Sequence, residues 1–427
     1  MSHTMRSRAQ KTRGPRQRSA FLIDLLGKAG IEVNGDHPWD VQVVDGRVAS
    51  RVARRGITGL GEAYVEGWWE CAALDQFFER VMRAGLPAQM RRPPRVLLTF
   101  MRNQIMNVQS RSRALRNGRA HYDRGNDLFC AMLDRRLAYS CGYWMNASNL
   151  DDAQEAKLDL VCRKLGLRPG MRLLDIGCGW GSLVRHAADR FGVRAVGITV
   201  ADEQVTYARD ACRGLDVEVR LQDYRELDEQ FDRIASIGMF EHVGPKNYRG
   251  FMRVARRCLA EDGLFLLHTI GTRDSFPNPT RSELDWVERN IFPGAVMPSM
   301  KQIGAALDGV FVTEDVENFG ADYDPTLMAW HANFDAAWAD LAPKYGERFR
   351  RMWRYYLLSC AGAFRSRAYQ VWQFALSPRG VPGGYQRTRQ VSDTAQESER
   401  RRLQVRSNGA AEADLRMREG GSHAREG

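Results

Sequence analysis

The chain has 427 residues, of which 44% are hydrophobic, and a formal net charge of +11. It is too long for one ordinary domain, so we expect two or three domains with substantial cores. No apolar run approaches the roughly 20 residues that a membrane-spanning helix needs, and the N-terminus lacks the apolar core of a secretion signal. The sequence therefore predicts a cytoplasmic protein.

The positive charge indicates an anionic partner, and both nucleic acid and an anionic lipid surface fit it. The sequence carries no helix-turn-helix, zinc-finger or RNA-binding signature, which weakens the nucleic-acid interpretation. Eight scattered cysteines without a CxxC pair argue against a zinc ribbon and against a disulfide framework. We therefore expect reduced thiols and no metal site.

Both ends of the chain are polar. Residues 1–20, MSHTMRSRAQKTRGPRQRSA, are basic and offer almost nothing to bury, which predicts a disordered tail. This tail is either merely solvated, or the product of a start placed before Met5, or a tether to anionic lipid at about 1 kcal/mol per basic residue. Residues 386–427 are rich in charges of both signs and are also predicted to be disordered.

Two folded regions are expected between these tails. Residues 21–97 combine a helical pattern, FLIDLLGKAG, with short extended pieces such as VQVVDG and the aromatic run GLGEAYVEGWWE, which predicts a small α+β N-terminal domain. Residues 98–120 are rich in Arg, Asn and Gln and have helical character, so we interpret them as a linker. The larger region covers residues 121–385.

The larger region alternates strands with helices. Its short apolar runs are RLLDIG, RAVGIT, VEVRLQ, FDRIASIG and GLFLLHTIG, and amphipathic stretches such as SLVRHAADRFG and YRGFMRVARRCLAEDG separate them. Continuous apolar strands that alternate with helices predict a parallel sheet covered on both faces, which is a doubly wound α/β fold. In such a sheet, ligands bind outside the carboxyl ends of the strands.

A glycine-rich loop, DIGCGWG, follows the first of these strands and opens a helix. Its glycines allow a sharp turn and close approach of a ligand to the main chain. The loop reads GxGxG rather than GxGxxG, and TVADEQ follows the second strand where a dinucleotide site would have an acid, so S-adenosylmethionine fits better than NAD. Gln222, Asp223 and Tyr224, after the third strand, offer an amide, a carboxylate and a ring for an adenine.

The stretch FEHVGPKNY follows the fourth strand and places Glu241 beside His242. A carboxylate next to an imidazole is typical of proton transfer. Neighbours on an extended chain face opposite ways, so we expect His242 to be structural. His268, at the end of the fifth strand, is placed beside the ligand by the predicted fold.

Eight blocks of sequence resemble the cyclopropane-fatty-acyl-phospholipid synthases, a family of S-adenosylmethionine-dependent enzymes. The resemblance runs from about residue 29 to residue 374, and its N-terminal part is similar to the bacterial phospholipid enzymes rather than to the shorter mycolic-acid cyclopropane synthases. It implies a Rossmann-like methyltransferase fold for residues 121–385. The blocks are GLGEAYVEGWWE, HYDRGNDLF, YSCGYW, LLDIGCGWG, LQDYRELDEQFDRI, GMFEHVGPKNY, LLHTIG and NFGADYDPTLMAW.

The resemblance implies a methyl transfer from the sulfonium of S-adenosylmethionine to a cis double bond of a phospholipid acyl chain. The former methyl then loses a proton, with bound bicarbonate as the base, and the ring closes. Glu241 would accept the proton of the ion, because two anions would otherwise repel. The residues that match the bicarbonate cradle are Cys141, Glu241, His268, Ile270 (through its backbone) and Tyr323.

Taken alone, Cys141 would more often be a small buried hydrophobe, and Tyr323 could be an ordinary turn residue. The resemblance also implies a set of residues that contact the cofactor. Thr199 and Gln204 match the segment that binds its ribose. The full set expected at the cofactor is Tyr139, Ser140, Asp175, Gly177, Gly179, Thr199, Gln204, Gln222, Asp223 and Tyr224.

The segment RMWRYYLLSCAGAFRSRAYQVWQF has aromatic and aliphatic residues at helical spacing. Core packing explains this pattern. The resemblance implies in addition that part of the segment lines an acyl tunnel, where Tyr or Trp faces could stabilise a cation by roughly 0.5–2 kcal/mol each.

The resemblance implies a peripheral membrane enzyme on the inner face of the membrane, whose N-terminal domain docks on a bilayer with unsaturated acyl chains. We expect no nucleic-acid partner, and the sequence leaves a homodimer open. Three alternatives remain: a fatty-acyl methyltransferase that adds a branch, an inactive lipid-surface binding protein, and a nucleic-acid methyltransferase. The last usually carries an NPPY or PC motif, and this sequence has neither.

Overall fold

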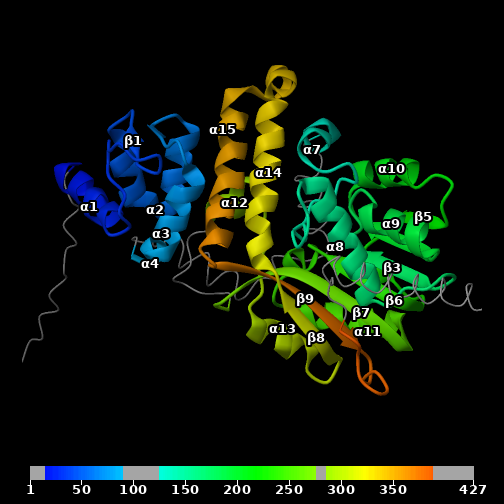
Figure 1. Cartoon of the computed structure of the whole chain (residues 1–427). Coiled ribbons are helices and arrows are strands. Elements are labelled where there is room, and N and C mark those ends of the chain that lie inside the picture. The colour runs from blue at the N-terminus through cyan, green and yellow to red at the C-terminus, as the bar shows by residue number, and fades with distance from the viewer. Residues whose placement is uncertain (1–14, 90–124, 276–284, 388–427) are drawn as a thin grey trace, which may run out of the picture. The chain divides into compact units, whose positions relative to one another are not determined.

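The structure is a computed structural model that describes residues 15–89, 125–275 and 285–387 (Figure 1). The chain divides into two compact units, residues 1–386 and 387–427, and the elements below belong to the first. The linker predicted at residues 98–120 and nearly all of the tail predicted at 386–427 lie outside the described residues.

The N-terminal region is mostly helical. Its elements are α1 (Pro15–Gly27), β1 (Gln42–Val43), α2 (Arg47–Val65), β2 (Trp69–Glu70), α3 (Leu74–Arg83) and α4 (Leu86–Gln89). The two short strands pair antiparallel, with Gln42 opposite Glu70. The predicted helix FLIDLLGKAG is therefore confirmed, and the extended piece VQVVDG contains only the two residues of β1.

The prediction of a disordered tail is wrong for residues 15–20, because α1 already begins at Pro15. The fixed φ of proline suits the first position of a helix. Leu22, Leu25 and Leu26 bury one side of the C-terminal half of the same helix.

The sheet of the larger region has seven strands in the order β5-β4-β3-β6-β7-β9-β8. The five predicted strands are confirmed and run parallel. The strands are β3 (Arg172–Ile176), β4 (Arg194–Thr199), β5 (Val217–Leu221), β6 (Phe231–Ile237), β7 (Leu259–Thr272), β8 (Val312–Asn318) and β9 (Tyr369–Ser377).

The prediction of a parallel sheet is wrong at one edge, because β9 pairs antiparallel with both β7 and β8. The segment YQVWQF belongs to the stretch for which helical spacing predicts a helix, but it forms most of β9. Its three aromatic residues and one valine are residue types that are enriched in strands.

Helices cover both faces of the sheet. Leu174 and Ile176 of β3 point into one apolar cluster, and Leu173 points into another, as alternation along a buried strand requires. The helices of this region are α7 (Asn126–Met132), α8 (Leu150–Lys164), α9 (Ser182–Phe191), α10 (Asp202–Ala211), α11 (Tyr248–Cys258), α12 (Asp285–Asn290), α13 (Met300–Leu307), α14 (Tyr323–Ala336) and α15 (Trp338–Arg365), with 3₁₀ turns η1 (Tyr224–Glu226), η2 (Phe240–His242) and η3 (Gly320–Asp322).

The N-terminal and larger regions share one core. Helices α14 and α15 run side by side (Figure 1), and α15 packs against α2 and α3. A Cβ at Gly362 of α15 would lie 2.4 Å from the carbonyl oxygen of Asp75 in α3, so only glycine permits this approach. Arg365 then bonds Asp75 at 2.6 Å and Asp324 at 2.7 Å. The described parts of residues 21–97 and 121–385 thus form one compact unit rather than two.

Candidate active site

A cavity lies at the carboxyl ends of β3, β4, β5 and β6. This is the edge of the sheet at which a doubly wound fold binds ligands. All ten residues that the sequence assigned to the cofactor line it: Tyr139, Ser140, Asp175, Gly177, Gly179, Thr199, Gln204, Gln222, Asp223 and Tyr224.

The glycine loop between β3 and α9 forms the floor of this cavity. Gly177 has a φ of 87°, which an L side chain rarely adopts, and a Cβ there would lie 2.8 Å from the side chain of Met239. Because glycine has no side chain, the backbone of this tight turn itself forms part of the cavity wall, and a ligand can approach it closely. This is the role that the sequence predicted for the loop.

One end of the cavity holds opposite charges. The carboxylate of Asp175 is buried, and its Oδ1 lacks a hydrogen-bond partner among the described residues. Burial raises the pKa of Asp175 to about 7. Lys157 of α8 also lines this wall and donates to Ser140 Oγ at 2.9 Å, and burial lowers the pKa of its ammonium to about 8. A ligand with an ammonium and a carboxylate, such as an amino acid, would complement both groups.

Lys157 was missed by the sequence analysis. A signal was present: α8 places Ala153, Lys157, Leu160, Val161 and Lys164 on one stripe at helical spacing, and all five are buried. A lysine on the apolar stripe of a helix is seldom buried without a specific partner.

The other end of the cavity suits a nucleoside. Thr199 donates to Gln204 Oε1 at 2.7 Å, so the two predicted ribose contacts form one pair. Asp223 accepts from the guanidinium of Arg225 at 2.8 Å, which fixes its carboxylate at the rim. The ring of Tyr224 lies beside it in the wall.

A second cavity adjoins the first. The two share Tyr139, Ser140, Gly238 and His242, so a ligand in the first can face a ligand in the second. Its other walls are largely apolar and come from β7, the segment 285–297, α14, α15 and the start of β9. The remaining lining residues are Glu241, His268, Ile270, Val287, Glu288, Phe292, Ala295, Met297, Tyr323, Leu327, Tyr356, Cys360, Phe364 and Tyr369.

Glu241 is the acid of the second cavity. Its Oε1 accepts from the backbone N–H of Ile270 at 2.5 Å, whereas its Oε2 is buried with no hydrogen-bond partner among the described residues. Burial raises the pKa of Glu241 to about 7. A buried carboxylate oxygen without a donor is costly, so this atom indicates that a ligand with a proton to donate completes the site.

Two members of the predicted cradle make contacts within the protein. The backbone amide of Ile270 donates to Glu241 Oε1, and Ile270 also lines the second cavity. Cys141 is not among the residues that line either cavity, and its thiol donates to the carbonyl of Gly142 at 3.2 Å. Burial raises the pKa of this thiol well above its usual range, so it is protonated, and its part in the cradle stays a prediction.

His268 and Tyr323 face Glu241 across the same cavity. Burial, together with the positive charges of Lys157 and Lys164, lowers the pKa of His268 well below its usual range, so its imidazole is neutral. Burial keeps the Tyr323 hydroxyl protonated by raising its pKa. Tyr323 begins α14 and stacks on Phe364 with ring centroids 4.4 Å apart, so it is not an ordinary turn residue.

His242, which the sequence predicts to be structural, is among the residues that line both cavities. The prediction assumed an extended backbone, but Glu241 and His242 lie in the 3₁₀ turn η2. Successive side chains in such a turn are about 120° apart rather than opposite, so both can reach the cavity side. Burial lowers the pKa of His242 to about 4, so it is a neutral imidazole at the junction.

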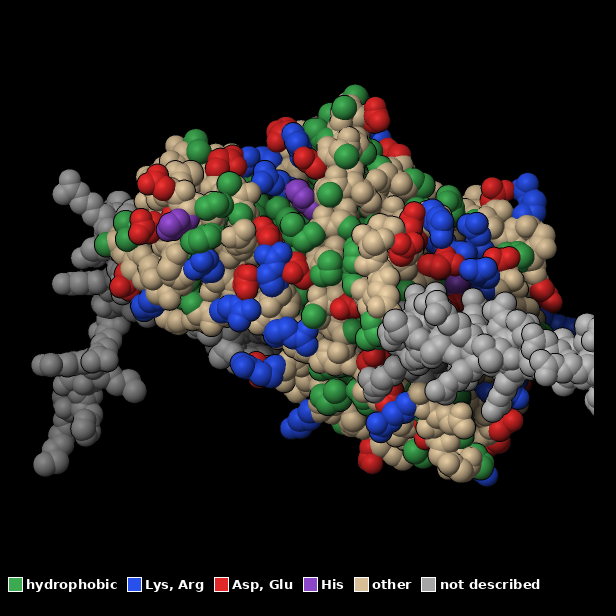
Figure 2. Space-filling model, in the orientation of Figure 1, with side chains coloured by type: hydrophobic (Ala, Val, Ile, Leu, Met, Phe, Trp, Pro, Cys, Tyr) green, Lys and Arg blue, Asp and Glu red, His purple; other side chains and the backbone are tan. Residues whose placement is uncertain are grey.

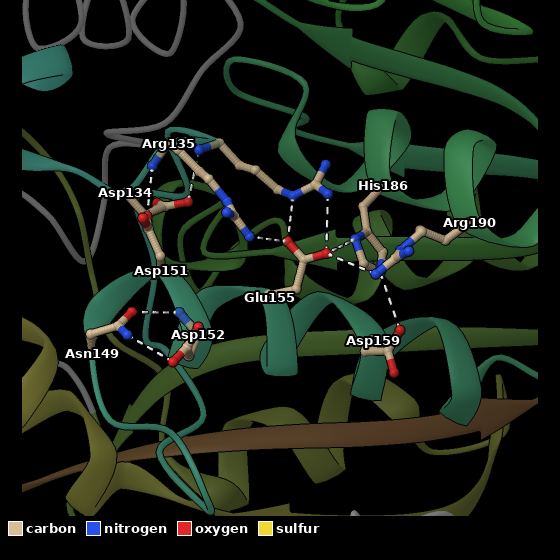
Figure 3. A network of polar contacts seen from close by, with 10 residues as sticks. Asp134, Arg135, Asn149, Asp151, Asp152, Glu155, Asp159, His186 and Arg190 are labelled. Carbon is tan, nitrogen blue, oxygen red and sulfur yellow. Dashed lines mark hydrogen bonds and ion pairs between the residues drawn. The ribbon is translucent and has the colours of Figure 1, made fainter.

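A network of charges fixes the helix that carries Lys157 (Figure 3). The side chain of Asn149 caps α8 by accepting from the N–H of Asp152 at 2.9 Å. Farther along, Glu155 pairs with Arg136 at 2.7 Å, and His186 of α9 contacts Asp159 at 3.4 Å. These contacts tie α8 to the loop before it and to α9, and so set the position of its buried lysines.

Comparison with known proteins adds to this geometry. Residues 109–374 match the family model for mycolic acid cyclopropane synthetase. The chain is 50% identical over 361 residues to the cyclopropane-fatty-acyl-phospholipid synthase of Escherichia coli K12, covering 84% of this chain and 93% of that protein.

Two solved structures are similar in fold. The cyclopropane synthase MmaA2 from Mycobacterium tuberculosis has a TM-score of 0.58 and 32% identity, over 61% of this chain and 97% of that one. The mycolic acid cyclopropane synthase CmaA1, complexed with SAH and CTAB, has a TM-score of 0.58 and 34% identity over the same shares.

Proposed function

Because the chain belongs to the cyclopropane-fatty-acyl-phospholipid synthase family, we propose that it converts the cis double bond of an unsaturated phospholipid acyl chain into a cyclopropane, with S-adenosylmethionine as the donor. One observation carries the proposal. A polar cavity built for the cofactor opens into an apolar cavity that contains a buried acid with an unpartnered oxygen.

The first cavity suits S-adenosylmethionine. Asp175 would bind the ammonium group of the amino-acid end of S-adenosylmethionine. Lys157 and Ser140 would bind the carboxylate of the same end. Thr199 and Gln204 would contact the ribose. The cofactor supplies an electrophilic sulfonium methyl, and the shared wall at Ser140 and Gly238 is where this methyl would enter the second cavity.

The second cavity suits a bicarbonate ion. Bicarbonate accepts hydrogen bonds on several sides and carries one donor, which matches the unpartnered Glu241 Oε2. The neutral His268 and the Tyr323 hydroxyl can donate to its oxygens. When bound, the ion would take up the proton that the former methyl loses before the ring closes. An anion beside a carbocation also stabilises it, and each preorganised polar group can contribute about 3–4 kcal/mol.

The second cavity borders the N-terminal region. A third cavity, with room for about one water molecule, shares Val287, Cys360 and Tyr369 with the second. Ile57 of α2 and Phe78 of α3 line it. We infer that the N-terminal region closes the far end of the acyl site. Tyr356, Cys360 and Phe364 of α15 line the second cavity, in keeping with the tunnel expected from that helix.

The N-terminal region also offers a surface for the membrane, which we name the Trp68 patch and define as Val44, Arg47, Arg51 and Trp68. The guanidinium groups of Arg47 and Arg51 lie 4.4 and 3.7 Å from the Trp68 ring, and Val44 is 68% exposed. In Figure 2, Lys and Arg side chains intermingle with hydrophobic ones on the visible face. Tryptophan and arginine suit the boundary between head groups and acyl chains.

Among the described residues, no helix is both long and apolar enough to span a bilayer. We propose that the enzyme binds the inner face of the membrane peripherally, through the Trp68 patch and its net positive charge.

The test uses purified full-length protein, S-adenosylmethionine and vesicles of an unsaturated anionic phospholipid. We expect the acyl chains to gain the mass of one methylene and to show upfield ring protons in the NMR spectrum. The same mass gain without ring protons would instead identify a fatty-acyl methyltransferase that adds a branch. Bound cofactor with no mass gain would contradict the proposed substrate.

A further inference from the structure

A row of buried polar side chains crosses three neighbouring strands beside the second cavity. His268 of β7 is in register with Gln373 of β9, which is in register with Glu317 of β8. Residues opposite one another on paired strands point to the same face of a sheet. All three are less than 9% exposed, and only His268 reaches the cavity wall. Gln373 and Glu317 therefore reach the cavity only through His268.

Lys164 of α8 covers this row. Its Nζ donates to Gln373 Oε1 at 2.8 Å and to Glu317 Oε2 at 2.5 Å. An ammonium group has only donors, so the oxygen of the Gln373 amide must face it. The Gln373 Nε2 then faces His268 Nδ1, at 3.3 Å. The salt bridge thus fixes which end of the amide the imidazole meets.

The amide nitrogen can only donate, so His268 Nδ1 must accept. A neutral imidazole carries one proton, which must then reside on Nε2. Since Nδ1 is turned towards Gln373, Nε2 is the ring nitrogen left for the second cavity. An N–H at that position suits an anion, whereas the lone pair of the other tautomer would repel it.

We propose that Gln373, oriented by Lys164 and Glu317, is a positioning residue that holds His268 in the tautomer with its proton on Nε2 and so turns an N–H donor towards the anion of the second cavity. The identity of this anion as bicarbonate rests on the proposed function. The orientation of the imidazole does not, because it follows from the contacts of Lys164 and Gln373 alone.

The direct test is the nitrogen-15 NMR spectrum of the full-length protein labelled at histidine, recorded without bicarbonate. His268→Asn identifies the signals of His268. We expect a protonated Nε2 and an unprotonated Nδ1. A proton on Nδ1 of the unsubstituted protein would overturn the proposal, and this measurement needs no substitution of Gln373, Lys164 or Glu317.

The substitution Gln373→Glu then replaces the hydrogen-bond donor that faces His268 with an acceptor, in a side chain of almost the same shape. Its carboxylate can accept from both Lys164 and the imidazole, so we expect the proton of His268 to move to Nδ1. Gln370→Glu is the matched control, because Gln370 lies on the same strand and contacts Asn318 and Arg367 rather than His268. An unchanged His268 tautomer in Gln373→Glu would contradict the inference.

The kinetic consequence is separate. In Gln373→Glu we expect the bicarbonate concentration for half-maximal rate to rise about 10–100-fold, the size typical of residues that orient a ligand from behind. Gln370→Glu should leave it unchanged. If the wild-type rate proves independent of bicarbonate while the tautomer is as expected, the choice of anion fails and the role of Gln373 stands. If Gln373→Glu shifts the tautomer but not the bicarbonate response, His268 does not bind the ion and the second half of the proposal fails.

Discussion

The two adjoining cavities each contain a buried carboxylate with one oxygen that has no hydrogen-bond partner among the described residues, and we propose opposite roles for the two acids. Asp175 shares its wall with Lys157, so it meets a ligand of mixed charge. Glu241 lies in a cavity whose other lining residues are mostly neutral, with Glu288 as a second acid on its wall. Burial raises the pKa of both acids to about 7. The difference shows that the neighbours decide the role of a buried acid: Asp175 would bind a cation, whereas Glu241 would accept a proton from a protonated anion.

We expect the largest change in kcat from a substitution of Glu241, whereas a substitution of Asp175 should act on cofactor binding. Glu241→Gln should lower kcat by about 10²–10³-fold, because an amide cannot match the bonds that the carboxylate makes to the ion and to the Ile270 amide. Its dissociation constant for S-adenosylhomocysteine, measured by isothermal titration, should stay near the wild-type value. Glu288→Gln is the matched control on the wall of the same cavity. Wild-type kcat in Glu241→Gln would remove Glu241 from the mechanism.

Substitution of the other acid, Asp175, should change the affinity for the cofactor. Asp175→Asn should weaken S-adenosylhomocysteine about 10–100-fold, since a charge-assisted hydrogen bond to the ammonium contributes about 1.5–3 kcal/mol. Its affinity for vesicles should not change. If calorimetry finds equal cofactor affinity, the ammonium does not bind at Asp175.

The two cavities also differ in how far their residues can be predicted from the sequence. Most of the first cavity comes from strand ends and one glycine loop, which have a recognisable pattern, whereas Tyr139 and Ser140 were expected only from the family resemblance; all ten line the cavity. The second comes from segments between residues 139 and 369, and its details depend on packing. The Cys141 thiol donates to the Gly142 carbonyl, and His242 lines the cavity because η2 is not extended. Neither fact has a local sequence signal, whereas a lysine on an apolar helical stripe, as at Lys157, has one.

The charge pair of the first cavity should give cofactor binding a maximum between about pH 7 and pH 8. Below the Asp175 pKa of about 7, the free carboxyl is protonated and must lose that proton to bind an ammonium. Above the Lys157 pKa of about 8, the free amine is neutral and must gain a proton to bind a carboxylate. Affinity should fall by up to about tenfold per pH unit on either side.

Calorimetry with two ligands checks this assignment. Lys157→Met should remove the fall at high pH and weaken S-adenosylhomocysteine, yet leave 5′-methylthioadenosine unchanged, because that nucleoside lacks the amino-acid end. An equal loss for both ligands would mean that Lys157 supports the cavity and does not bind the carboxylate.

The smallest expected effect concerns the Trp68 patch. Arg51→Ala should weaken binding to anionic vesicles about fivefold, as expected from roughly 1 kcal/mol per basic residue near the surface. The effect should vanish at high salt. Arg213→Ala, an exposed arginine of the larger region, is the control. Co-sedimentation with vesicles measures both, and equal losses in the two variants would argue for a general effect of charge.

The central claim is that the unpartnered oxygen of Glu241 marks the site of a bound bicarbonate. The most direct measurement is the rate of cyclopropane formation in buffer depleted of bicarbonate, followed as bicarbonate is restored, for the wild type and for Glu241→Gln. The account predicts a saturable rise in the wild type and a flat, low rate in the variant. A wild-type rate that is equally high without bicarbonate would contradict it.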